Sequence, residues 1–95
     1  MIVTTSILLE RAAHGGYAVP ALNVDNLESV KAVLEASAEM NAPVIVQTIP
    51  ATLRYGGEAT YVALVNALYD GGADIALHLH HGRDEEICAR CVGYG

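Results

Sequence analysis

The sequence has 95 residues, of which 53% are apolar and 17% are charged, and its formal net charge is −6. This composition excludes a disordered acidic tail and indicates a packed interior in one domain, 1–95. The acidic balance gives no electrostatic footprint for nucleic acid or for an anionic membrane surface, so we expect neither partner. The first dozen residues lack a basic leader and a long apolar run, which favours a soluble, cytoplasmic protein.

The first predicted element is a short helix from Ser6 to about Ala13. The apolar run YAVPALN at 17–23 then predicts a strand buried on both faces, as in a parallel sheet. After this strand, Asp25 and Glu28 resemble a capping box. Apolar residues then recur along one face of a helix from about Leu27 to Met40.

Two further strands are predicted by the runs APVIVQT (42–48) and DIALHL (74–79). Between them, PATLRYGGE (50–58) is expected to be a loop, and the helix after it should end at Gly71 and Gly72. The buried stripe of that helix is predicted to consist of Tyr61, Val65, Leu68 and Tyr69. A last helix is expected after the third strand, because acidic side chains favour a first helical turn: Asp84, Glu85 and Glu86.

The pattern is therefore a leading helix followed by three βα units with parallel strands. Each unit has the length of a strand, a crossover helix and two short loops. Eight such units form a (β/α)₈ barrel, and three of them would leave an apolar sheet edge unpaired. The sequence predicts an α/β fold, a partial TIM (β/α)₈ barrel that corresponds to the amino-terminal segment of a longer domain.

Three histidines lie at the end of the third predicted strand, where a barrel places its active site: His78, His80 and His81. His78 and His80 are two positions apart and should point to the same face of the strand. We expect His78 to be a packed, hydrogen-bonded barrel residue, with metal binding as the alternative. His14, beside two glycines, is expected to form the cationic end of the first helix.

Cys88 and Cys91 form a C-x-x-C motif inside the last predicted helix. A redox motif needs its first sulfur at a helix amino end, and a structural zinc site needs a second pair of ligands. We therefore interpret the two cysteines as core-facing or partly exposed thiols. The stretch RYGGE lacks the spacing of a phosphate-binding fingerprint and has no P-loop lysine.

Three stretches together resemble the opening third of a class II, zinc-dependent fructose- or tagatose-bisphosphate aldolase. They are GYAVPALNVDNLESVKAVLEASAEMNAPVIVQT, RYGG and IALHLHHGRDEE, and the resemblance extends from about Ser6 to Gly95. It implies reversible retro-aldol cleavage of a phosphorylated ketose, fructose- or tagatose-1,6-bisphosphate, to dihydroxyacetone phosphate and glyceraldehyde 3-phosphate. The cofactor it implies is Zn²⁺, which polarises the ketone carbonyl.

The resemblance also implies roles for three residues. His81 matches the family's zinc ligand, and Asn23 matches the family's substrate contact at the end of the first strand. His80 stands where the family has an aspartate that moves a proton at the substrate's C4 hydroxyl. Without the resemblance, Asn23 would be read as a turn residue that bonds its own backbone.

Two positions depart from the family pattern. Imidazole can donate or accept a proton, but a neutral His80 beside a zinc ligand can also bind the metal, so we expect this change to impair catalysis. Ile49 replaces a small hydroxyl residue that many relatives carry near the substrate. The other two zinc ligands and the phosphate loops of the family come from later strands. We therefore expect the chain to be inactive alone and to belong to a homo-oligomer in its full-length form.

Two other functions fit the residues. The chain could be a non-catalytic βα module that assembles through its sheet edges. It could also be a small metal-binding module built from the three histidines of the third strand and the two cysteines.

Overall fold

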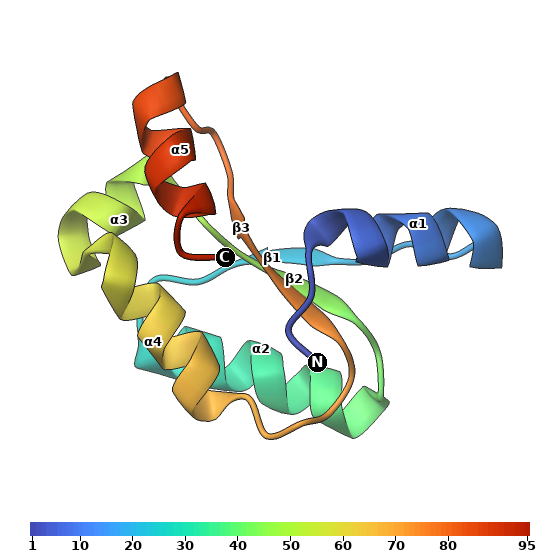
Figure 1. The fold of residues 1–95 in the computed structure, drawn as a ribbon. Coiled ribbons are helices and arrows are strands. Elements are labelled where there is room, and N and C mark those ends of the chain that lie inside the picture. Colours follow the sequence, from blue (N-terminus) through green and yellow to red (C-terminus); the bar gives the residue numbers. More distant parts are fainter.

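The computed structural model describes residues 1–95. Figure 1 shows a parallel sheet with helices on both sides. The strands run in the spatial order β1-β2-β3, and all pairs are parallel. The elements in chain order are α1 (Thr5–Gly15), β1 (Ala21–Asn23), α2 (Leu27–Met40), β2 (Val44–Thr48), α3 (Pro50–Gly56), α4 (Glu58–Leu68), β3 (Ile75–Leu79) and α5 (Glu85–Val92).

This architecture confirms the predicted partial (β/α)₈ barrel with its leading helix and three βα units. The second and third strands, the leading helix and α2 lie where the apolar patterns predicted them. No helix is both long enough and apolar enough to cross a membrane.

The prediction of a loop at 50–58 is wrong for residues 50–56, which form the helix α3. Pro50 occupies the first turn, where its missing N–H costs no hydrogen bond and its fixed φ suits a helix. The side chains of Pro50, Thr52 and Leu53 are buried, so packing stabilises this short helix. Gly57, at φ 88°, then separates α3 from α4.

Three predicted boundaries also differ. The first strand is confined to Ala21–Asn23, because only these residues pair with β2. α4 ends at Leu68 rather than at the glycines that follow, and Tyr69 caps it in an extended conformation. The capping box of α2 pairs Asn26 with Ser29 instead of Asp25 with Glu28.

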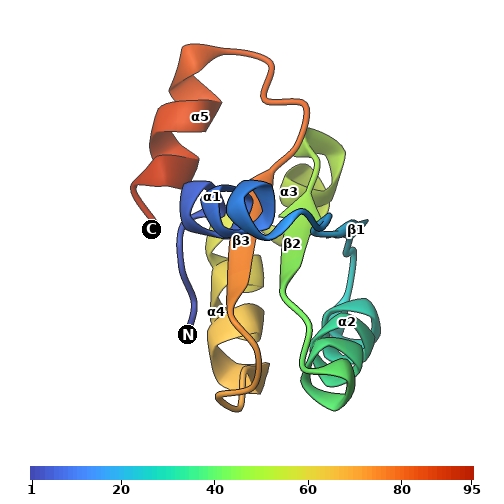
Figure 2. The same cartoon turned by 90° about the vertical axis from the view of Figure 1, so that its right-hand side faces the viewer.

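Figure 2 shows α1 lying across the strands on one face of the sheet, with α3 and α4 behind the other face. Each face carries one apolar cluster. The larger cluster packs β2 and β3 against α2, α3 and α4, and its members are Val24, Val30, Leu34, Val44, Val46, Leu53, Tyr61, Val65 and Ile75. On the other face, Leu8 of α1 packs against Ile45 and Ala76. Strand residues alternate between the two faces, which explains why neighbouring residues belong to different clusters.

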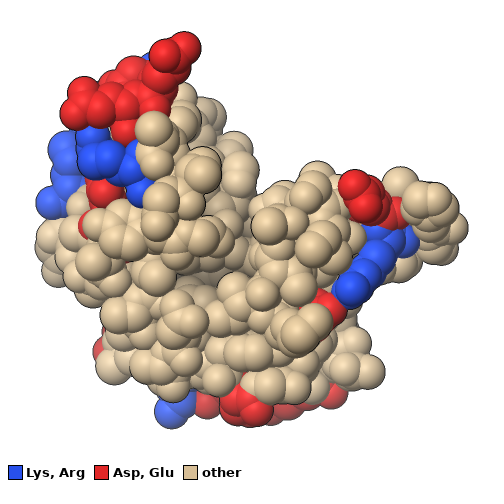
Figure 3. All heavy atoms as spheres, viewed as in Figure 1, with Lys and Arg blue, Asp and Glu red and all other residues tan.

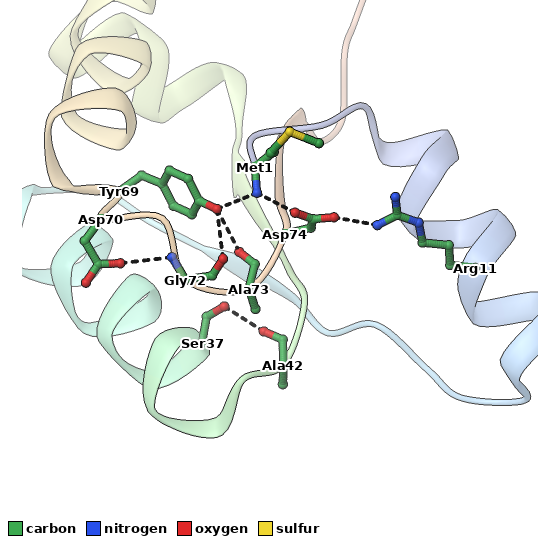
Figure 4. Close-up of polar contacts among 9 residues, drawn as sticks. All are labelled: Met1, Arg11, Ser37, Ala42, Tyr69, Asp70, Gly72, Ala73 and Asp74. Atoms are coloured by element: carbon green, nitrogen blue, oxygen red, sulfur yellow. Dashed lines mark hydrogen bonds and ion pairs between the residues drawn. The ribbon is translucent and has the colours of Figure 1, made fainter.

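The loop before β3 is fixed by polar contacts to α1 and to the first residue (Figure 4). The Asp74 carboxylate binds the Met1 ammonium and the Arg11 guanidinium. Hydrogen bonds from these two cations, first the ammonium and then Arg11, lower the pKa of Asp74. The Tyr69 hydroxyl donates to the Gly72 carbonyl at 3.0 Å, so the amino end of β3 is held from two sides.

Candidate functional site

Three polar side chains form a row across the sheet near the carboxyl ends of the strands. The register places Asn23 beside Gln47 and Gln47 beside His78. Two residues earlier on β2 and β3, Ile45 and Ala76 contact α1. Because residues two apart share a face, the row lies on the α1 side of the sheet, the side that a closed barrel turns inward.

Asn23 and Gln47 are joined by a side-chain hydrogen bond. The Gln47 Nε2 donates to the Asn23 Oδ1 at 2.6 Å. The Asn23 side chain is exposed, and its amide nitrogen keeps its donors for another partner. Gln47 was not predicted as a site residue, although a polar residue within a buried apolar run was the available signal.

The three histidines continue from this row past the end of β3. The His80 N–H donates to the Thr48 carbonyl at 2.8 Å, which extends the β2–β3 ladder by one residue. The His80 ring centroid lies 6.2 Å from that of His78 and 4.1 Å from that of His81. His81 is exposed and has φ 58°, an uncommon value for a residue with a side chain.

His78 is half-buried, as its predicted role in the barrel required. Burial, and then the charge of His80, lower its pKa from the ordinary value of 6.5. No hydrogen bond of its ring is present, so the predicted hydrogen-bonded state is not seen in this structure. The lowered pKa favours the uncharged form of the ring.

The remaining candidates have simpler environments. The His14 Nδ1 lies 2.8 Å from the Glu10 carbonyl in the last turn of α1, the helix end that favours a cation. Cys88 and Cys91 are free thiols within α5, as expected. Burial raises the pKa of Cys91, which is the opposite of what a reactive cysteine needs.

No three side chains of the types His, Cys, Asp and Glu come together as a set of metal ligands. The small metal-binding module therefore lacks the donor set that a zinc site needs. His80 and His81 offer imidazole donors of the kind that zinc takes, but they make only part of a site.

A groove of about 440 Å³ lies beside β3, between the start of α1 and α5. Figure 3 shows this hollow without charged atoms, while acidic groups lie at the start of α5, near α1 and along the lower edge of the view. The groove follows the outer edge of β3, where only Ile75 has a strand-like partner, the segment around Ile2. Its lining residues are Thr4, Thr5, Leu77, His78, Leu79, Gly82, Cys88, Cys91, Val92 and Gly95.

Ile49 occupies the N-cap position of α3, and its side chain makes no capping hydrogen bond. A hydroxyl at this position can accept from the first turn of the helix, whereas the hydrocarbon side chain of isoleucine cannot. Isoleucine at position 49, where the family pattern has a small hydroxyl residue, thus leaves the amino end of α3 without a side-chain cap.

Comparisons with known proteins agree with this geometry. A family model described as fructose-bisphosphate aldolase class-II matches residues 3–95. Among solved structures, the YdjI aldolase from Escherichia coli K12 superposes with a TM-score of 0.86 at 22% sequence identity. The match covers 100% of this chain and 37% of that protein, so the chain spans little more than a third of that protein's length.

Proposed function

The chain belongs to the class II fructose-bisphosphate aldolase family, and from this premise we propose that it forms one side of a zinc-dependent ketose-bisphosphate aldolase site. The observation that carries the proposal is the common position of Asn23, His80 and His81 at the carboxyl end of one parallel sheet. Barrel enzymes build their active sites at this end. The substrate class is a phosphorylated ketose, fructose- or tagatose-1,6-bisphosphate.

Aldolases of this class generally use a divalent metal ion. We assign His81 as one ligand of a zinc ion, because it is exposed beyond the last residue of β3 and presents an imidazole. When bound, the metal would polarise the ketone carbonyl and stabilise the negative charge that develops as the carbon–carbon bond breaks. The other two protein ligands of a three-ligand site would come from barrel strands beyond these three.

His80 is assigned the proton transfer at the substrate's C4 hydroxyl. Its backbone is fixed by the ladder bond to Thr48, and its ring contacts the ring of His81. A carboxylate becomes neutral when it accepts a proton, whereas His80 would become a cation beside the metal ion, which the metal's charge disfavours. The neutral imidazole can also bind the metal itself, so His80 is a less suitable proton shuttle in this position than the aspartate of the family pattern.

Asn23 is assigned a substrate contact. Because its oxygen already accepts from Gln47, its amide nitrogen is the group left to bind a hydroxyl of the ketose. Gln47 holds this amide in one orientation, which keeps its donor directed at the substrate.

The test is a complete barrel in which this chain replaces the matching segment of the E. coli aldolase. We expect slow, zinc-dependent cleavage of a ketose bisphosphate, and we expect His80→Asp to increase kcat by about 100-fold or more, the usual contribution of a well-matched acid–base residue. His81→Ala should abolish the zinc dependence and the activity, while His14→Ala, a histidine at the far end of α1, should change neither. A folded chimera that binds zinc but gains nothing from His80→Asp would contradict the assignment of His80. Unchanged zinc affinity in His81→Ala would contradict the metal ligand.

A further inference from the structure

Asp25 lies two residues after Asn23 and is bound by three helices. Its backbone N–H donates to the Ser29 Oγ of α2 at 2.9 Å. Its carbonyl accepts from the Tyr61 hydroxyl of α4 at 2.8 Å, and its carboxylate accepts from the Thr52 hydroxyl of α3 at 3.1 Å. The backbone N–H, the carbonyl and the carboxylate of this one loop residue thus each have a partner on a different helix.

The contact from Tyr61 depends on a glycine. The Tyr61 side chain is 2% exposed, and its ring lies against Gly56 at the end of α3. A Cβ added at Gly56 would lie 2.5 Å from the Tyr61 hydroxyl oxygen and 2.8 Å from two ring carbons. Gly56 has a helical backbone conformation, so the position requires the absence of a side chain and not a positive φ.

The loop is fixed on its other side by β2. Val24, between Asn23 and Asp25, is fully buried, and its N–H donates to the Gln47 carbonyl at 3.0 Å. The same residue, Gln47, donates from its side chain to the Asn23 amide oxygen. The backbone of residues 24 and 25 is therefore held by β2 at Val24 and by α4 at Asp25. The orientation of the Asn23–Gln47 amide pair depends on both of these contacts.

We propose that Gly56 and Tyr61 position the Asn23–Gln47 amide pair by holding the Asp25 carbonyl. This assignment gives the first glycine of RYGG a role that does not involve phosphate: it makes room for the tyrosine hydroxyl. The proposal rests on the proposed function, in which Asn23 contacts the ketose. Tyr61 and Gly56 touch no substrate and are positioning residues.

The side-chain amide of Gln47 reports directly on this arrangement, because Gln47 is the only glutamine in the sequence. Labelling the chain with ¹⁵N-glutamine gives one side-chain amide group in the NMR spectrum, and its hydrogen exchange with solvent can be measured. We expect Tyr61→Phe to accelerate this exchange about five- to tenfold, the effect of losing about one hydrogen bond's net stabilisation. Tyr69→Phe is the matched control, since it removes a hydroxyl bond at the opposite end of the sheet and should leave the Gln47 signal unchanged.

Gly56→Ala should act like Tyr61→Phe, because the added methyl group displaces the tyrosine ring. Thr52→Val is nearly isosteric and removes only the hydrogen bond to the Asp25 carboxylate. It takes the place of Tyr61→Phe or Gly56→Ala if either of them fails to fold. Backbone exchange in α2 is measured in the same samples as a reference for global opening. The proposal is overturned if the Gln47 amide exchanges at the unaltered rate in the folded variants, or if it accelerates only in step with α2. Neither result depends on zinc binding or cleavage, so this test fails or succeeds separately from the proposed function.

Discussion

At the scale of single residues, the environment of each histidine decides what it can do. His78 is half-buried on the barrel-interior face and has no hydrogen-bond partner, while His81 is exposed beyond the strand. Burial disfavours the charged form of His78, and a second imidazole one step along the same face adds to the effect. Identical side chains within four positions thus receive different environments from the fold.

The lowered pKa of His78 predicts a pH dependence of stability. The folded protein binds this proton less tightly than the unfolded chain does, so acidification favours unfolding. The stabilising contribution is complete above the ordinary value of 6.5 and is lost as the pH falls through the lowered folded-state value. We expect His78→Gln to flatten the decline in the free energy of unfolding below neutral pH, measured by urea denaturation at a series of pH values. His14→Gln is the control, and an equal flattening in that variant would contradict the role of His78.

At the scale of elements, the start of α2 shows how a local hydrogen-bond pattern selects a boundary. Asn26 accepts from the Ser29 N–H at 2.8 Å, and the Ser29 hydroxyl in turn accepts from the Asn26 N–H at 3.1 Å. This reciprocal pair satisfies two of the free N–H groups at the helix start. Asp25 is then available to bind α3 and α4, which links the cap of one helix to the position of two others.

Removing this cap should be measurable. We expect Asn26→Ala to lower the free energy of unfolding by about 1 kcal/mol, the typical loss for an N-cap asparagine. Asn66→Ala is the control, because Asn66 is exposed within α4 and its amide bonds only its own helix, to the Val62 carbonyl. Its replacement should be neutral or slightly stabilising, since alanine is the better helix former. Equal losses in the two variants, measured by thermal or urea unfolding, would contradict the capping role.

At the scale of the whole molecule, α1 is held on the sheet by a small apolar cluster. Leu8 is 1% exposed and packs on Ile45 and Ala76, whereas the adjacent Leu9 is 50% exposed. This contact covers the part of the barrel-interior face that precedes the polar row. α1 therefore separates the apolar end of that face from the end that carries Asn23, Gln47 and His78.

The pair of adjacent leucines provides a direct comparison. We expect Leu8→Ala to lower the free energy of unfolding by about 3 kcal/mol through lost burial and an unfilled cavity. Leu9→Ala should change it by less than about 0.5 kcal/mol, as is usual for a surface position. Hydrogen exchange in α1 should rise in the Leu8 variant while exchange in α2 changes less. If both variants lose the same stability, α1 does not dock through Leu8.

The sequence alone determined the type of fold and the order of the strands and of all the helices except α3. Continuous apolar runs indicated the three parallel strands, and helical spacing of apolar residues located α2, because both signals depend only on periodicity along the chain. The expected burial holds for β2 and for the first residues of β3, whereas all three residues of β1 are exposed. The histidine-rich end of β3 and Asn23 could also be selected from the sequence, since polar residues at strand ends are readable in order. The proposed roles of Asn23, His80 and His81 remain predictions.

Only the tertiary structure decided the contacts that connect distant segments. α3 forms because Pro50, Thr52 and Leu53 are buried by other elements, a packing effect that a local reading of PATLRYGGE does not contain. Gln47 became part of the site through its register with Asn23, and Gly56 gained its role from the ring of Tyr61. These relations depend on which side chains meet across strands and helices, and periodicity along one chain carries no information about such partners.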